Sequence, residues 1–197
     1  LTLLKTLFGI YYGLPFPYEP DEPTFVTAAG AVLANRDLNP HWFGHPGSTT
    51  IYLLSAVYAL IFVIGYLLGI FKSPEDFRLL YHDDATLTYL SGRLLMVIFS
   101  VAVVFLISQI GKRLFNPKVG LMAGLITALS PLYVNFSKFI RTDIIVTYFI
   151  LLSLWFCINY HDRQRWRDLI LAGVFIGLAV ATKYPAVIFS VILLLVV

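Results

Sequence analysis

Long apolar stretches alternate with short polar segments along most of this chain. Between Pro23 and Asn35 the apolar residues recur at helical spacing, which predicts a short amphipathic helix on a membrane surface. Elsewhere the apolar residues are consecutive, and several stretches approach the roughly 20 residues that a helix needs to cross a bilayer. Membrane β-barrels would require alternation instead. The apolar stretches cover about residues 1–14, 48–71, 94–110, 119–136, 144–160, 169–181 and 186–197.

Prolines mark the places where these helices should end or break. A group of three, Pro15, Pro17 and Pro20, follows the first stretch and should terminate it. Two further breaks are expected inside apolar sequence, at Ser130-Pro131 and at Tyr184-Pro185. The chain is therefore predicted to be a set of membrane helices with defined interruptions.

The composition agrees with an all-α integral membrane protein and excludes a soluble globular domain. Hydrophobic residues make up 59% of the 197 residues, charged residues only 13%, and the mean hydropathy is +0.83, whereas soluble domains carry about 25% charged residues. The single Cys157 excludes an intrachain disulfide or a cysteine metal site. Because the chain begins at Leu1 and ends inside apolar sequence, we expect the N-terminal part of a longer transmembrane domain, incomplete at both ends.

Basic loops suggest how the helices are oriented. The loops at 111–118 and 161–167 are rich in Lys and Arg, and such short loops stay in the cytoplasm. The turn at 137–143 and the polar segment 72–93 should then lie outside. The stretch 48–71 stays open: it either spans, placing Asp21 and Asp143 on opposite faces, or lies at the interface with both ends outside. Hydropathy favours a span, and charge does not decide.

An acidic cluster follows the first apolar stretch, with Glu19, Asp21 and Glu22 between prolines. One interpretation is a helix start, with Asp21 as the N-cap before Pro23. That interpretation does not account for the two glutamates. Acidic residues are expensive beside a membrane unless they are solvated or functional. The functional hypothesis is that Asp21 is a general base that removes a proton from an acceptor hydroxyl.

Two later segments carry cations beside apolar helices. In Arg141-Thr142-Asp143 the acid could cap the next helix and the arginine could anchor it at the interface, or the arginine could bind a phosphate as a bidentate fork. Lys183 has apolar sequence on both sides, so it either snorkels to the surface or binds a lipid-linked phosphate. Arg93 reads as an interfacial anchor.

Other binding signals are weak or absent. His41 and His45 have a metal-ligand spacing, but Gly44 and Pro46 argue against the helix that such a site would need. His45 could instead bond a phosphate or a sugar. No glycine-rich phosphate loop is present, so a sugar donor would be lipid-linked and not a nucleotide sugar. No nucleic-acid partner is expected.

Four pieces of the chain, taken in order, resemble the GT-C superfamily of polytopic glycosyltransferases. The resemblance is to the dolichyl-phosphate-mannose protein mannosyltransferase-like group, which includes the aminoarabinose transferases. The pieces are Asp21-Glu22-Pro23, His45-Pro46-Gly47, the run from Lys112-Arg113-Leu114-Phe115 through Ala128-Leu129-Ser130-Pro131-Leu132 to Arg141-Thr142-Asp143, and Thr182-Lys183-Tyr184-Pro185.

This resemblance implies a GT-C helix bundle in which 15–93 form an extracytoplasmic loop with interfacial helices and 94–197 form transmembrane helices. Such enzymes pass a sugar from a polyprenyl-phosphate donor to an acceptor protein, lipid or glycan. A multi-pass protein of a prokaryotic cell membrane, with its site facing outward, is expected. The implied catalytic residues are Asp21 as base, Glu22 and Asp143; the implied donor-phosphate ligands are Arg141, Lys183 and His45.

Three alternatives accompany this interpretation. The main hypothesis needs no metal, and the first alternative is a metal-dependent enzyme in which Asp21 and Asp143 hold a divalent cation. The second is a membrane transporter, because broken helices and an intramembrane Lys183 also occur in transporters. A transporter should hold its charges near mid-membrane, whereas an enzyme of this kind should gather them at one face. The third is a non-catalytic scaffold, which would leave Asp21 and Asp143 far apart.

Overall fold

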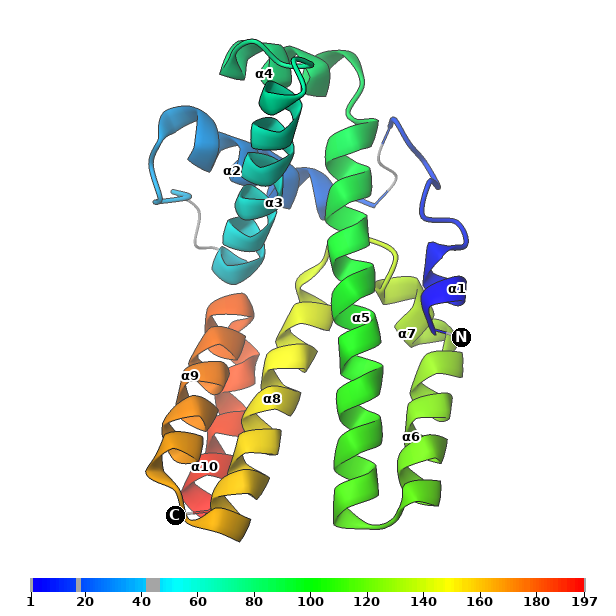
Figure 1. Cartoon of the computed structure of the whole chain (residues 1–197), viewed down its shortest axis with the longest axis vertical. Helices are drawn as coiled ribbons and strands as arrows, with labels where there is room; N and C mark the ends of the chain where they lie inside the picture. The colour runs from blue at the N-terminus through cyan, green and yellow to red at the C-terminus, as the bar shows by residue number, and fades with distance from the viewer. Residues whose placement is uncertain (1, 17–18, 42–46, 197) are drawn as a thin grey trace.

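The computed structural model describes residues 2–16, 19–41 and 47–196, and within these ranges it contains helices and no strands (Figure 1). This confirms the predicted all-α class. The elements are α1 (Thr2–Leu7), α2 (Glu22–Asn35), α3 (Ser48–Leu67), α4 (Pro74–Asp83), α5 (Thr86–Leu114), α6 (Pro117–Leu129), α7 (Pro131–Phe136), α8 (Thr142–Arg163), α9 (Trp166–Thr182), the 3₁₀ helix η1 (Tyr184–Ser190) and α10 (Val191–Val196).

Three helices, α3, α5 and α8, are long and apolar enough to cross a membrane, and α6 and the segment Tyr184–Leu194 are shorter apolar helices. The expected interruptions are present. A break at Ser130 separates α6 from α7, and the extended residue Lys183 separates α9 from η1. Apolar helices of this number and length are those of an integral membrane protein.

The 29-residue helix α5 runs along the length of the molecule, with α6 and α8 beside its lower half (Figure 1). It begins at Thr86, earlier than the predicted start at Leu94, so the first turns of the helix come from sequence that looked polar. Arg93 is fully buried in this part of α5. The prediction that Arg93 is an interfacial anchor is therefore wrong, and its burial is possible because a buried carboxylate neutralises it.

Close backbone contact fixes α6 against α5. Asn116 caps α6 by accepting a hydrogen bond from the Val119 N–H at 3.0 Å. Ser108 of α5 donates to the carbonyl of Gly120 at 2.8 Å, and a Cβ at Gly120 would overlap the backbone of α5. Small residues allow such an approach between membrane helices, where van der Waals contact drives association.

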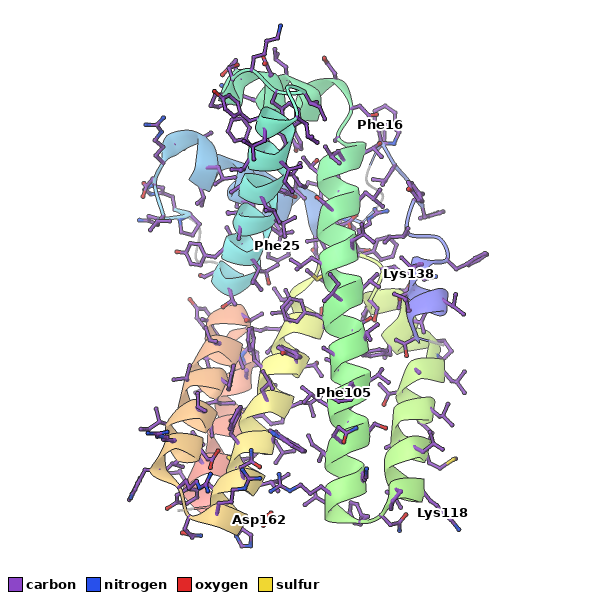
Figure 2. All side chains as sticks on the ribbon, viewed as in Figure 1. Phe16, Phe25, Phe105, Lys118, Lys138 and Asp162 are labelled. Atoms are coloured by element: carbon purple, nitrogen blue, oxygen red, sulfur yellow. The ribbon has the colours of Figure 1, made fainter. Side chains whose placement is uncertain are left out.

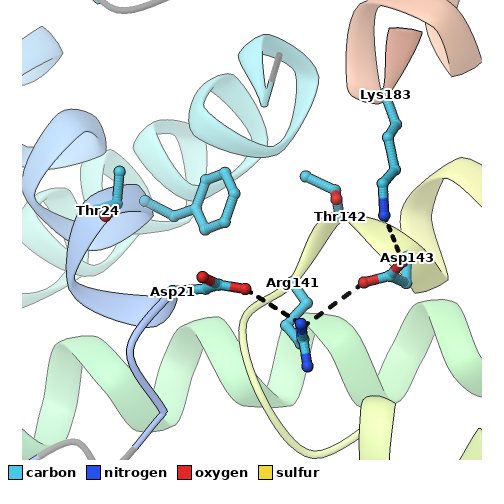
Figure 3. Close-up of a pocket in the computed structure, with 7 residues that line it drawn as sticks. Asp21, Thr24, Arg141, Thr142, Asp143 and Lys183 are labelled. Atoms are coloured by element: carbon cyan, nitrogen blue, oxygen red, sulfur yellow. Dashed lines mark hydrogen bonds and ion pairs between the residues drawn. The ribbon is translucent and has the colours of Figure 1, made fainter. Parts of the chain in front are cut away.

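The two basic loops lie at the same end of the bundle, as the charge argument predicted. Figure 2 shows Lys118 of one loop and Asp162 of the other at this lower end. Arg113 joins the loops: it forms an ion pair with Asp162, donates to Asn159, and stacks on the Trp155 ring at 4.9 Å. The 137–143 turn precedes α8 and Lys183 follows α9, so both lie at the end of these helices that is away from the basic loops (Figures 1 and 3).

Helix α2 packs across α3 through its predicted apolar face, so the expectation that this face lies on a membrane surface is wrong. Phe25, Val26, Ala29 and Val32 are buried in one cluster with residues of α3. Ser55 of α3 adds a hydrogen bond to the Ala29 carbonyl at 3.1 Å. This packing holds the acidic start of α2 at a fixed place beside the bundle.

Most of the stretch 48–71 forms α3, which ends at Leu67 and is stacked end to end on α9 (Figure 1). Thr49 in the first turn of α3 donates to the Leu178 carbonyl near the end of α9 at 3.3 Å. Helices of 20 and 17 residues placed in line extend about 55 Å. A bilayer core is about 30 Å thick, so α3 and α9 cannot both lie within one bilayer core, although the length and composition of α3 would allow it to span.

Candidate active site

A pocket of about 120 Å³ opens where α2, the start of α8 and the end of α9 meet (Figure 3). Residues from three distant segments of the chain form it, and four of them are charged. Its lining consists of Asp21, Thr24, Phe25, Arg141, Thr142, Asp143 and Lys183.

Asp21 occupies the N-cap position of α2, but its side chain makes no capping hydrogen bond. The carboxylate accepts a hydrogen bond from Arg141 Nη2 at 3.1 Å, and the side chain is 53% exposed. Capping alone therefore does not explain this residue, and its side chain is accessible to a ligand in the pocket.

Arg141 lies at the centre of the charged group. Its backbone is extended at the N-cap position of α8, and its guanidinium rests on the Phe136 ring at 4.9 Å. Nη1 is 3.4 Å from Glu19 Oε1, and Nε is 3.6 Å from Asp143 Oδ2. Nε is buried and has no hydrogen-bond partner.

Lys183 completes a row of ion pairs across the pocket (Figure 3). Its Nζ donates to Asp143 Oδ1 at 2.7 Å, and the helix break before Pro185 turns the side chain toward α8. Asp143 is in the first turn of α8, where the helix dipole favours a negative charge. The row runs from Asp21 through Arg141 and Asp143 to Lys183.

Beneath the pocket, Glu22 and Arg93 form a fully buried ion pair. Arg93 Nε and Nη2 donate to the two Glu22 oxygens at 2.9 and 2.6 Å, and both side chains are 0% exposed. Glu22 Oε1 also accepts from the Ile140 N–H at 2.9 Å. Glu22 directly follows Asp21, and Ile140 directly precedes Arg141. The hydrogen bond between them therefore holds together the two segments that carry these pocket residues.

Arg93 donates through Nη1 to the carbonyls of Ile10 and Tyr12 at 2.6 and 2.8 Å. The pair therefore fixes four segments at once. Sequence reasoning missed this role of Arg93, although an arginine inside a membrane helix needs a partner. Nothing local indicates that the partner is Glu22, 71 positions earlier in the chain.

Two further predictions concern His45 and a bound metal ion. His45 lies outside the described residues. Within those residues, no group of three or more His, Cys, Asp or Glu side chains is arranged to hold a metal. A divalent ion at Asp21 and Asp143 would therefore have to complete its ligands from the substrate or from water, and these two carboxylates are joined to each other only through Arg141.

The family comparison covers most of this site. The family described as dolichyl-phosphate-mannose-protein mannosyltransferase matches residues 86–197, which is more than half of the chain. No curated protein and no solved structure matches the chain. The matched range contains Arg93, Arg141, Asp143 and Lys183, and Asp21 lies before it. The chain belongs to the dolichyl-phosphate-mannose-protein mannosyltransferase family and is thus a membrane glycosyltransferase of the GT-C type.

Proposed function

We propose that the pocket is the site at which a sugar passes from a polyprenyl-phosphate donor to a hydroxyl of an acceptor protein, lipid or glycan. One observation carries this proposal. Asp21, Arg141, Asp143 and Lys183 come from three distant segments and converge on one pocket at the ends of apolar helices. A carboxylate and two cations at such a place suit a reaction in which a hydroxyl attacks and a lipid phosphate leaves.

In this reaction the acceptor oxygen forms a bond to the anomeric carbon of the sugar. The bond from that carbon to the phosphate oxygen breaks, and its electron pair leaves with the polyprenyl phosphate. Asp21 takes the acceptor proton. Arg141 and Lys183 stabilise the negative charge on the leaving phosphate. Asp143 holds Lys183 in place, and Glu22 orients Asp21 from below, since its burial keeps it away from the acceptor.

The proposed membrane placement puts α6, α8, α9 and the lower half of α5 in the bilayer, with the pocket at the extracytoplasmic face. The basic loops at the other end then face the cytoplasm. Residues 15–93 form a cap on the outer side, and α3 belongs to this cap because it continues in line beyond α9 (Figure 1). A bilayer donor would reach the pocket along the apolar helices while the acceptor arrives from the aqueous side.

The same geometry speaks against the transporter alternative. A substrate site of a transporter lies near the bilayer midplane, between discontinuous helices. Here the charged residues gather at the first turn of α8 and just after the last turn of α9. Lys183 is not an isolated intramembrane charge, because Asp143 neutralises it.

The proposal is tested by Asp21→Asn in the full-length protein in lipid nanodiscs, with release of sugar from a polyprenyl-phosphate donor as the readout. Turnover should fall by about 10²–10⁴-fold, as expected for loss of a general base. Asp84→Asn is the matched control, because Asp84 is exposed and the contacts described for it are hydrogen bonds from Thr86, away from the pocket. Turnover of the Asp21 variant equal to that of the control would refute the assignment. Chelation and metal addition on the wild type separate the metal-dependent variant.

A further inference from the structure

Within the pocket, the cations proposed to bind the donor phosphate already form ion pairs with carboxylates. Among the described residues, Arg141 contacts Glu19, Asp21 and Asp143, and Lys183 contacts Asp143. Three carboxylates facing two cations give the group a formal net charge of −1. A phosphate brings further negative charge, so it can bind well only if a carboxylate moves away from Arg141.

Asp21 is the most exposed of the three carboxylates. It is 53% exposed, against 21% for Glu19 and 30% for Asp143, and it is held by one hydrogen bond of 3.1 Å. Asp143 is held more firmly, because Lys183 binds it at 2.7 Å and the first turn of α8 favours its charge.

The hydrogen-bonding state of Arg141 indicates where a phosphate would bind. Guanidinium groups hold phosphates through two parallel N–H donors on one edge. On the Nε–Nη2 edge, Nη2 is bonded to Asp21, while Nε is buried, lies 3.6 Å from Asp143 Oδ2 and has no hydrogen-bond partner. A phosphate on this edge would take Nη2 from Asp21 and could offer an acceptor to Nε once the Asp21 side chain has moved away.

We propose that the donor phosphate and Asp21 compete for Arg141, so that binding of the donor releases Asp21 to act as the base. This inference rests on the proposed function, since it requires a phosphate ligand in this pocket. Arg141 then holds Asp21 in the resting enzyme and the phosphate in the loaded one. The donor binds first, and the acceptor hydroxyl is deprotonated only after the donor is in place.

The exchange predicts that removing the base tightens donor binding. Full-length wild type and Asp21→Asn in nanodiscs are titrated with polyprenyl phosphate, which carries the lipid and the phosphate but no sugar. Because the Asp21 side chain of this pair is about half exposed and Arg141 is partly exposed, solvent screens the pair and the gain in affinity should be about two- to fivefold. The same titration in an Arg141→Gln background should show no gain from Asp21→Asn, which separates competition for Arg141 from a general loss of negative charge.

Each outcome has a distinct meaning. Wild type that does not bind polyprenyl phosphate refutes the proposed function. Wild type that binds, together with an Asp21→Asn variant that binds no more tightly, overturns the exchange alone. A gain that persists in Arg141→Gln also overturns it. If Arg141→Gln does not fold, Arg141→Lys replaces it, because lysine keeps the charge without the fork. The gain from Asp21→Asn should then be smaller than with arginine present, and an equal gain overturns the exchange.

Discussion

Replacing Glu22 by glutamine tests whether the buried pair positions the site. The substitution keeps the shape of the side chain but leaves the Arg93 charge without a counter-charge, at a place where both groups are 0% exposed. Removing one partner of a buried ion pair costs about 3–5 kcal/mol. Arg93 and the Ile140 N–H both donate to Glu22, and glutamine keeps one acceptor oxygen for these donors. We therefore expect a loss of stability at the lower end of this range, about 3 kcal/mol.

The assay is thermal unfolding of the full-length protein in detergent micelles, followed by turnover at a temperature where the variant is folded. Glu75→Gln is the matched control: the same chemical change in an exposed pair with Arg78 at 3.7 Å, expected to cost about 0–1 kcal/mol. Turnover of Glu22→Gln should also fall by about tenfold or more, because a shift of about 1 Å between Asp21 and Arg141 costs up to about 10²-fold.

A double variant separates the charge effect from simple loss of packing. Arg93→Met alone leaves Glu22 buried and unpaired, whereas Arg93→Met with Glu22→Gln leaves no buried charge. The double variant should therefore be more stable than the sum of the two single effects predicts. A Glu22→Gln variant that is as stable as Glu75→Gln, or that turns over as fast as the wild type, would contradict this role of the buried pair.

Two further predictions concern stability away from the pocket. Gly120→Ala places a Cβ against the α5 backbone and should destabilise the protein by about 1–3 kcal/mol, measured by unfolding in detergent. Gly173→Ala is the control and should be nearly neutral, because no atom lies within 4 Å of the added Cβ. Equal effects of the two substitutions would contradict the close packing of α6 on α5. The backbone N–H of Lys72 donates a hydrogen bond to the Asp76 carboxylate, and this bond is the main reason that the pKa of Asp76 is lowered. Hydrogen bonds with Ser73 lower the pKa further. Because the folded pKa is the lowered one, the 72–76 turn should be ordered at neutral pH and loosen as the pH falls below about 4; amide hydrogen exchange should show this in wild type and a flat pH response in Asp76→Asn.

Much of the architecture can be predicted from the sequence because it depends on local interactions. Apolar length identifies membrane helices, and proline fixes where they break, as at Pro131 and Pro185. Basic loops identify which ends share a side. Asp21, Arg141 and Asp143 could be singled out because each sits where an apolar helix begins, and a charge at such a boundary needs water, a partner or a ligand.

Only the tertiary structure decided which charges meet. The sequence gives no information on the pairing of Glu22 with Arg93, since the fold alone brings residues 71 positions apart into contact. It also assigned the first turns of α5 to a polar loop, because the cost of a buried arginine disappears only when its counter-charge is known. The apolar composition of α3 fits a span, yet α3 continues in line from the end of α9, so the two helices cannot both lie within one bilayer core. Composition reports what an element can tolerate, whereas its place depends on packing against segments far away in the chain.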